Sequence, residues 1–278
     1  MKFPFKSKIY KFINSNIRNI VYKEIISPLA LGLAINEQRE KQNIRNKKVL
    51  YTCLTGKYDC LQIQQFVDVT VDYVCFTDNS DLLKYSRLGM WEIRPLKYNL
   101  MDNTKNSRWH KTHPHVLFPE YEQSVWVDSN ILIKSSFITD LFSRTDLILI
   151  PAHNIRDCIY DEAKACVKMK KENKANAESL IAYYVNEKFP RHYGLNETNV
   201  IYRKHNDENL KAIMEEWWTF VETKSKRDQL SLSYILWKHD IKPKNISIPN
   251  LRDKYNDVIF VEHNRGDCLK TQEFTAFK

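Results

Sequence analysis

Several common sequence features are missing from this chain, and each absence excludes a class of protein. The 278 residues include only 5 Gly and 9 Pro, with no Gly- or Pro-rich linker and no internal repeat, which argues against a repeat array. No apolar run is long enough to cross a bilayer. No uninterrupted apolar segment precedes a small-residue cleavage site, so we expect no signal peptide.

The cysteines form no C-x-x-C pair and no compact framework. There are six of them, at Cys53, Cys60, Cys75, Cys158, Cys166 and Cys268. Because several lie in apolar strand-like or helical settings, the spacing predicts buried free thiols in a reducing cytosol and argues against a zinc site.

Positive charge is unevenly distributed along the sequence. The formal net charge is +9, yet residues 1–48 alone carry eleven Lys and Arg against three Glu, whereas residues 49–278 carry thirty-two against thirty-one. A nucleic-acid-binding surface needs basic charge spread over its binding face. The nearly neutral body therefore argues against a nucleic-acid partner and indicates a basic appendage.

We expect residues 1–46 to form this appendage and residues 47–278 to form the main domain. Apolar residues such as Phe5, Ile9 and Ile13 recur at spacings of three and four among lysines, which predicts an amphipathic helix. Two interpretations stay open. Residues 1–28 could lie on an anionic membrane surface, giving a cytoplasmic protein attached peripherally to the inner membrane face, or the apolar stripe could pack on the main domain.

Strand-like and helix-like segments alternate through the main domain, which predicts an α/β fold. The predicted strands are 48–54, 71–77, 91–94, 124–128, 146–151, 199–203 and 258–262, and the predicted helices are 104–117, 135–143, 157–171, 176–187, 207–223 and 227–239. Such alternation gives a mostly parallel sheet with helices on both faces, whose ligands bind at the carboxyl ends of the strands.

A carboxylate and a carboxamide follow the apolar strand at 124–128. Asp128 and Asn130 are two residues apart, so on extended chain both side chains point the same way. Hard divalent cations prefer oxygen ligands and often share them with substrate phosphates. The pair predicts a Mn²⁺ or Mg²⁺ site on a nucleotide diphosphate, although an Asp in a turn is also common for local hydrogen bonding.

Taken in order, the motifs of this chain resemble a known glycosyltransferase family. They are Lys48–Asp59, Val71–Asn79, Asn106–Pro114, Ser124–Ile133, Pro151–Glu162, Trp217-Trp218 and Lys226–Ser231. Over residues 48–240 they are similar to the family first catalogued as domain of unknown function six-one-six, a GT-A-type group whose plant relatives include a pectin galacturonosyltransferase. Asn130 departs from a strict D-x-D motif, where a second Asp would stand.

The resemblance implies a GT-A-like, Rossmann-related fold and a set of donor-site residues. Arg108 and Lys111 match the family's Arg-x-x-Lys pattern and, three apart on a helix, would face the diphosphate. GT-A enzymes often recruit a late histidine to the metal, and His263 is the candidate here. It could equally be an ordinary loop residue.

Three residues in or just after the first two strands are candidates for the base pocket of a UDP-sugar. Tyr58, beside Thr52, offers a ring for stacking, and Asp78 offers a carboxylate that could accept a uracil N–H. Ordinary packing is the alternative for Tyr58. Further on, His153 and Arg156 are candidates for contacts with sugar hydroxyls.

Asp228 and Gln229 resemble the acceptor-side motif of the family, where a carboxylate orients a hydroxyl or acts as a base. Asp228 could instead be only a helix cap. We therefore expect a metal-assisted glycosyltransferase that passes a sugar from a UDP-sugar to a glycan acceptor in surface or capsular polysaccharide synthesis, with retention implied by the plant relatives. A glycoside hydrolase and a non-catalytic glycan-binding or scaffolding domain are the alternatives.

Overall fold

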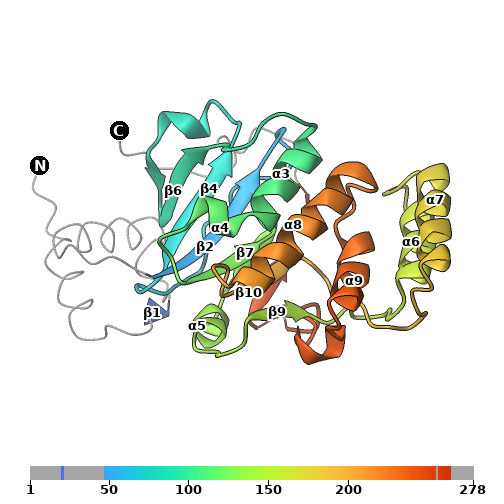
Figure 1. Ribbon diagram of the computed structural model, residues 1–278. Helices are drawn as coiled ribbons and strands as arrows, with labels where there is room; N and C mark the ends of the chain where they lie inside the picture. Colours follow the sequence, from blue (N-terminus) through green and yellow to red (C-terminus); the bar gives the residue numbers. More distant parts are fainter. Residues whose placement is uncertain (1–19, 22–46, 255, 264–278) are drawn as a thin grey trace, which may run out of the picture. The chain divides into compact units, whose positions relative to one another are not determined.

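The computed structural model describes residues 47–254 and 256–263, together with the backbone of Ile20 and Val21 (Figure 1). It is a mixed α/β structure that divides into two compact units, which are described separately. The first unit contains residues 1–97, 120–144 and 254–278, and the second contains residues 98–119 and 145–253. The predicted appendage boundary at residue 46 lies outside the described residues.

A mostly parallel sheet is the centre of the first unit (Figure 1). In sheet order its strands are β7 (Gln123–Val127), β2 (Lys48–Leu54), β4 (Asp72–Thr77), β6 (Trp91–Pro95) and β5 (Arg87–Leu88). The pairs β7–β2, β2–β4 and β4–β6 are parallel, and β5 is antiparallel. Parallel strands are buried on both faces, which explains the nearly continuous apolar run of β2.

The parallel register aligns the carboxyl ends of three strands. Leu54 pairs with Thr77, and Tyr51 pairs with Trp126, so β2, β4 and β7 all end at the same edge of the sheet. The loops that begin at Thr55, Asp78 and Asp128 therefore leave the sheet at this edge. The alternation of strands and helices in the sequence predicts this arrangement.

Short strands and one helix complete the described part of the first unit. They are β1 (Ile20–Val21), β3 (Phe66–Val67), β8 (Ile131–Ile133), α5 (Phe137–Phe142) and β12 (Val258–Phe260), with a 3-10 turn at Leu82–Lys84. Strand β8 pairs antiparallel with β12, and β1 pairs antiparallel with β3. The predicted amphipathic helix is thus wrong at Ile20 and Val21, because their backbone pairs with another strand; its other residues lie outside the described part of the chain.

The second unit combines three strands with most of the long helices. Strand β9 (Ile148–Pro151) pairs antiparallel with β10 (Val200–Arg203) and parallel with β11 (Ser247–Ile248). The helices are α3 (Asn103–Thr112), α4 (Pro114–Leu117), α6 (Ile159–Lys168), α7 (Lys174–Asn186), α8 (Glu208–Thr223) and α9 (Gln229–Lys238), with a 3-10 turn at Pro243–Asn245.

Local sequence signals fix where several of these helices begin. Asp102 and Asp207 accept hydrogen bonds from backbone N–H groups in the first turns of α3 and α8, as N-cap residues do. The predicted helix 104–117 is divided in two because Pro114 has no N–H and restricts the preceding residue. His113 accordingly leaves the helical region, with φ −114° and ψ 45°.

Among the cysteines that the structure describes, one differs from the expectation, and Cys268 lies outside the described residues. Cys53, Cys75, Cys158 and Cys166 are buried free thiols as predicted, but Cys60 is disulfide-bonded. The predicted set of free thiols is therefore wrong at Cys60. Within the described residues, every helix is too short or too polar to span a bilayer.

Candidate functional site

Asp59 connects the turn after β7 to a histidine near the end of the described chain, within the first unit. Its Oδ2 accepts a hydrogen bond from Ser129 Oγ, and its Oδ1 lies 2.7 Å from His263 Nδ1. The His263 ring also contacts the Tyr58 ring, with centroids 4.7 Å apart. We call Tyr58, Asp59, Asp128, Ser129 and His263 the strand-end cluster.

Local hydrogen bonds hold the turn of this cluster in shape. The Ile131 N–H donates to the Asp128 carbonyl at 3.0 Å, which reverses the chain into β8. Trp126 Nε1 donates to Asp128 Oδ1 at 2.8 Å, as expected for two side chains on the same face of an extended segment. Asp128 is therefore held at the end of β7 in a partly exposed position.

Asn130 joins this turn to the segment that carries His263. Its Nδ2 donates to the Val261 carbonyl at 3.1 Å, and its own carbonyl accepts from the Val261 N–H at 2.9 Å. The predicted metal ligands Asp128, Asn130 and His263 thus lie on segments that are tied together. Among the described residues, however, one group of three His, Cys, Asp or Glu side chains has ligand atoms within 4.8 Å of one another, and it lies in the second unit.

The donor set still fits a hard divalent cation. Asp128 and Asn130 supply oxygens, which Mg²⁺ and Mn²⁺ prefer. Because a carboxylate can only accept, His263 donates its Nδ1–H to Asp59, which leaves Nε2 as the lone-pair nitrogen. Metal-binding histidines are usually oriented by such a carboxylate.

The residues predicted to form a base pocket have different environments. Both carboxylate oxygens of Asp78 accept from the Gly56 N–H at 3.1 Å, so Asp78 closes the turn where Gly56 has φ 64°. Tyr58 is 45% exposed, which suits stacking on a planar ligand. Thr52 is buried within β2, and its hydroxyl has no hydrogen-bond partner among the described residues.

In the second unit, Asp228 is held by two cations and a hydroxyl. Lys111 Nζ donates to Asp228 Oδ2 at 2.7 Å and to the Thr198 carbonyl at 2.9 Å, while Thr198 Oγ1 donates to the same Oδ2 at 2.8 Å. Arg108 Nε lies 3.1 Å from Asp228 Oδ1. Burial acts to raise the pKa of Asp228, but Arg108 and Lys111 overcome it, so the pKa lies below its ordinary value.

These contacts change the interpretation of two predicted residues. The Lys111 side chain is 0% exposed and its ammonium faces Asp228 and Thr198, so its predicted place against a diphosphate does not match this arrangement. Asp228 makes no side-chain capping bond to α9. A carboxylate with a lowered pKa is also a weak base at neutral pH. The geometry therefore gives Lys111 and Asp228 a structural ion pair.

Glu162 contacts the remaining predicted site residues of the second unit. Its Oε2 accepts from Arg156 Nε and lies 3.5 Å from His153 Nε2, and its Oε1 accepts from Gln229 Nε2 at 3.3 Å. We call His153, Arg156, Glu162 and Gln229 the Glu162 cluster. Since Gln229 follows Asp228 directly, this cluster and the Asp228 ion pairs adjoin along the chain.

The charge states within the Glu162 cluster follow from its hydrogen bonds. Burial acts to raise the pKa of Glu162, but hydrogen bonds from His153 and Arg156 outweigh it and lower the pKa to about 2. His153 Nδ1 accepts from the Arg156 N–H at 3.0 Å, so the neutral imidazole carries its proton on Nε2, toward Glu162. Glu162 is consequently an anion that organises the donors of the cluster, and its Oε1 also accepts from Cys166 Sγ at 3.4 Å.

Sequence reasoning missed the two carboxylates at the centres of these clusters. Asp59 and Glu162 both lay inside recognised motifs, but neither was assigned a role. Asp59 had a signal, since it directly follows the turn after β2, at the same sheet edge as Asp128. Glu162 resembled an ordinary acidic residue in the first turn of α6.

Comparisons with known proteins identify one matching family. Its sequence profile, described as "TOD1/MUCI70, glycosyltransferase-like domain", matches residues 10–264. No curated protein sequence matches the chain.

Two solved structures show weak similarity. One is the apo structure of the bifunctional glycosyltransferase WbbM, with TM-score 0.40 and 11% identity over 73% of this chain, which spans 38% of WbbM. The other is the mannosyltransferase Ktr4p from S. cerevisiae, with TM-score 0.38 and 10% identity over 85% of this chain and 81% of Ktr4p.

Proposed function

The chain belongs to the family of TOD1/MUCI70 glycosyltransferase-like domains, and from this premise we propose that it transfers a sugar from a UDP-sugar to a glycan acceptor with the help of Mn²⁺ or Mg²⁺. The proposal extends to retention of anomeric configuration and to a hexosyl or uronosyl donor like that of the plant pectin enzymes. Surface or capsular polysaccharide is the proposed product.

The observation that carries the proposal is the position of Asp59 between the Asp128–Asn130 turn and His263. Asp59 binds Ser129 in the middle of that turn and orients the His263 ring. Two segments far apart in the sequence are thereby held together at the end of β7. Asp128, Asn130 and His263 would hold the cation, which when bound neutralises the charge that develops on the departing diphosphate.

Residues of this chain perform the remaining tasks in the proposal. Tyr58, exposed beside His263, would stack on the uracil ring. The Glu162 cluster would orient sugar hydroxyls, since Arg156 and Gln229 are donors and Glu162 is a permanent acceptor. Because its pKa is about 2, Glu162 orients hydroxyls rather than removing their protons at neutral pH.

One observation supports the non-catalytic alternative. Asp228, the predicted base, is buried against Lys111 and Arg108 and has a lowered pKa. Donor turnover with Mn²⁺ separates the three functions: a glycosyltransferase slowly hydrolyses its UDP-sugar without acceptor, a glycan-binding domain leaves it intact, and a glycoside hydrolase cleaves a glycan without nucleotide.

UDP binding measured by calorimetry tests the cation site directly. We expect Mn²⁺ to tighten UDP binding, and Asp128→Ala to abolish that gain while the protein stays folded by circular dichroism. Asp140→Ala is the matched control, because Asp140 is an exposed carboxylate on α5 of the same unit. Equal UDP affinity in EDTA and in Mn²⁺ would overturn the metal-assisted mechanism.

A further inference from the structure

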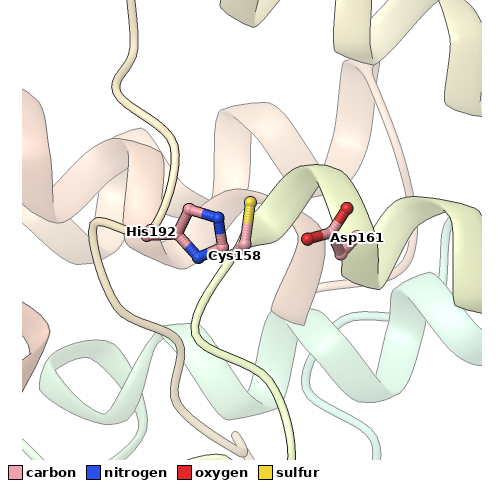
Figure 2. Close-up of side chains that lie close together, drawn as sticks. All are labelled: Cys158, Asp161 and His192. Carbon is pink, nitrogen blue, oxygen red and sulfur yellow. The ribbon is translucent and has the colours of Figure 1, made fainter.

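Three potential metal ligands meet in the second unit, apart from every residue assigned above. One ligand atom each of Cys158, Asp161 and His192 lies within 4.8 Å of the other two (Figure 2). Cys158 directly precedes α6, Asp161 is in its first turn, and His192 belongs to the segment between α7 and β10. Four-coordinate zinc places its ligand atoms about 3.5 Å apart. A shift of the three side chains toward one another by roughly 1 Å would therefore give them the spacing of zinc ligands.

His192 is already oriented as a metal-binding histidine would be. Its Nδ1 lies 2.8 Å from Asp157 Oδ1, so the Nδ1–H donates to this carboxylate and Nε2 keeps its lone pair. The His192 backbone has φ 55°, an uncommon left-handed conformation, and the nearby Gly194 N–H donates to the Asp157 carbonyl at 2.9 Å. The backbone thus fixes the ring beside the start of α6.

The charges around the cluster favour a cation. Cys158 is the N-cap residue of α6, so its thiol lies at the start of this helix. Asp157 and Asp161 supply two carboxylates, and Asp161 is also ion-paired with Lys164, whose Nζ lies 3.7 Å from Asp161 Oδ1. The Arg191 guanidinium instead lies over the Tyr160 ring, 4.6 Å from its centroid.

We propose that Cys158, Asp161 and His192 bind a zinc-class divalent cation, with Asp157 orienting His192. Sulfur and nitrogen ligands suit Zn²⁺ and disfavour Mg²⁺, Ca²⁺ and Mn²⁺, so this site is chemically distinct from the proposed diphosphate-binding site. The Cys158 thiol releases its proton on binding. His192 is exposed, which leaves a coordination position open to water, and the bound ion fastens residues 190–194 to α6.

Cobalt spectroscopy of the full chain, after removal of bound metal with a chelator, tests the proposal. Titration with Co²⁺ should produce a near-ultraviolet thiolate-to-cobalt charge-transfer band together with visible d–d bands, and Zn²⁺ should displace them. We expect Cys158→Ser and His192→Ala to abolish the charge-transfer band or weaken Co²⁺ binding strongly. Asp157→Asn should weaken binding about 10- to 100-fold, the usual effect of removing a carboxylate that orients a ligand.

Cys166→Ser is the matched control, because Cys166 is a second buried free thiol on α6 outside the cluster. It should retain the band. His192 is exposed, so His192→Ala keeps the test valid even if Cys158→Ser fails to fold. Absence of the band in the unmodified protein, or its persistence at full strength in Cys158→Ser, would overturn the proposal whether or not the chain transfers sugar.

Discussion

Asp228 is a buried carboxylate whose surroundings decide what it does. A helix cap would bond the N–H groups of α9, but Asp228 instead accepts from Lys111 and Thr198 and lies against Arg108. Its carbonyl also accepts from Trp217 Nε1 at 3.0 Å. Burying charge is unfavourable unless the charges are paired and hydrogen-bonded, so each partner depends on the others.

At this residue scale we predict that Asp228→Asn destabilises the protein. The substitution leaves the buried Lys111 ammonium without its countercharge, and removing one partner of a buried pair typically costs about 3–5 kcal/mol. Urea unfolding would measure the loss. Thr198→Val is the control, because it removes one hydrogen bond to the same carboxylate and should cost only about 0.5–1.5 kcal/mol.

A full loss of transfer by a stably folded Asp228→Asn protein would contradict this prediction. That outcome would return Asp228 to the acceptor-side role that the resemblance implied.

Just after helix α7, one residue has its backbone in the strained left-handed conformation. Lys188 follows the helix with φ 59°, and the Phe189 N–H donates to the Tyr184 carbonyl while the Lys188 N–H donates to that of Val185. This is the Schellman pattern, completed by contact between the Phe189 and Tyr184 rings, whose centroids are 5.8 Å apart. Glycine is the usual residue at the left-handed position.

At the element scale, Lys188→Gly should therefore stabilise the protein by about 0.5–1 kcal/mol, since relief of left-handed strain exceeds the added chain entropy. Thermal unfolding checks the sign. Ala182→Gly, at an exposed position inside the same helix, should lower stability by about 1 kcal/mol. Loss of stability in both variants would show that the strain at Lys188 is negligible.

Two buried histidines make the stability of the whole molecule depend on pH. His110 and His205 are 0% and 1% exposed, and burial lowers the pKa of each to about 4. In the unfolded chain they titrate near 6.5. The unfolded state therefore binds more protons between pH 6.5 and 4, so stability is highest above this range and falls as the pH decreases through it.

At the scale of the whole molecule, we predict a loss of roughly 3 kcal/mol per buried histidine between pH 6.5 and 4. Urea midpoints measured at several pH values would show it. His205→Gln should flatten part of the slope, because Gln can donate to the Phe118 carbonyl that His205 Nε2 contacts at 2.9 Å. His239→Gln is the control, because His239 is exposed, and it should leave most of the pH dependence of stability unchanged. Parallel slopes for wild type and His205→Gln would contradict the assignment.

The sequence by itself determined the order and approximate bounds of the elements. Strands 48–54, 91–94 and 124–128 were predicted within a residue or two, because continuous apolar runs and their turn residues are local signals. Strands of two residues, such as β5 and β11, were missed since they have no period of their own. The α/β class and the mostly parallel sheet followed from the same alternation.

Only the tertiary structure decided which side chains meet. Asp59 contacts His263 across 204 residues, Lys111 contacts Asp228 across 117, and Cys158 lies near His192 although α6 and α7 separate them in the sequence. Spacing reveals which side of its own strand or helix a residue occupies, but partners this distant depend on how the chain folds back and packs. The same packing decides burial, and burial together with its neighbours turned Asp228 from a predicted base into one member of an ion pair.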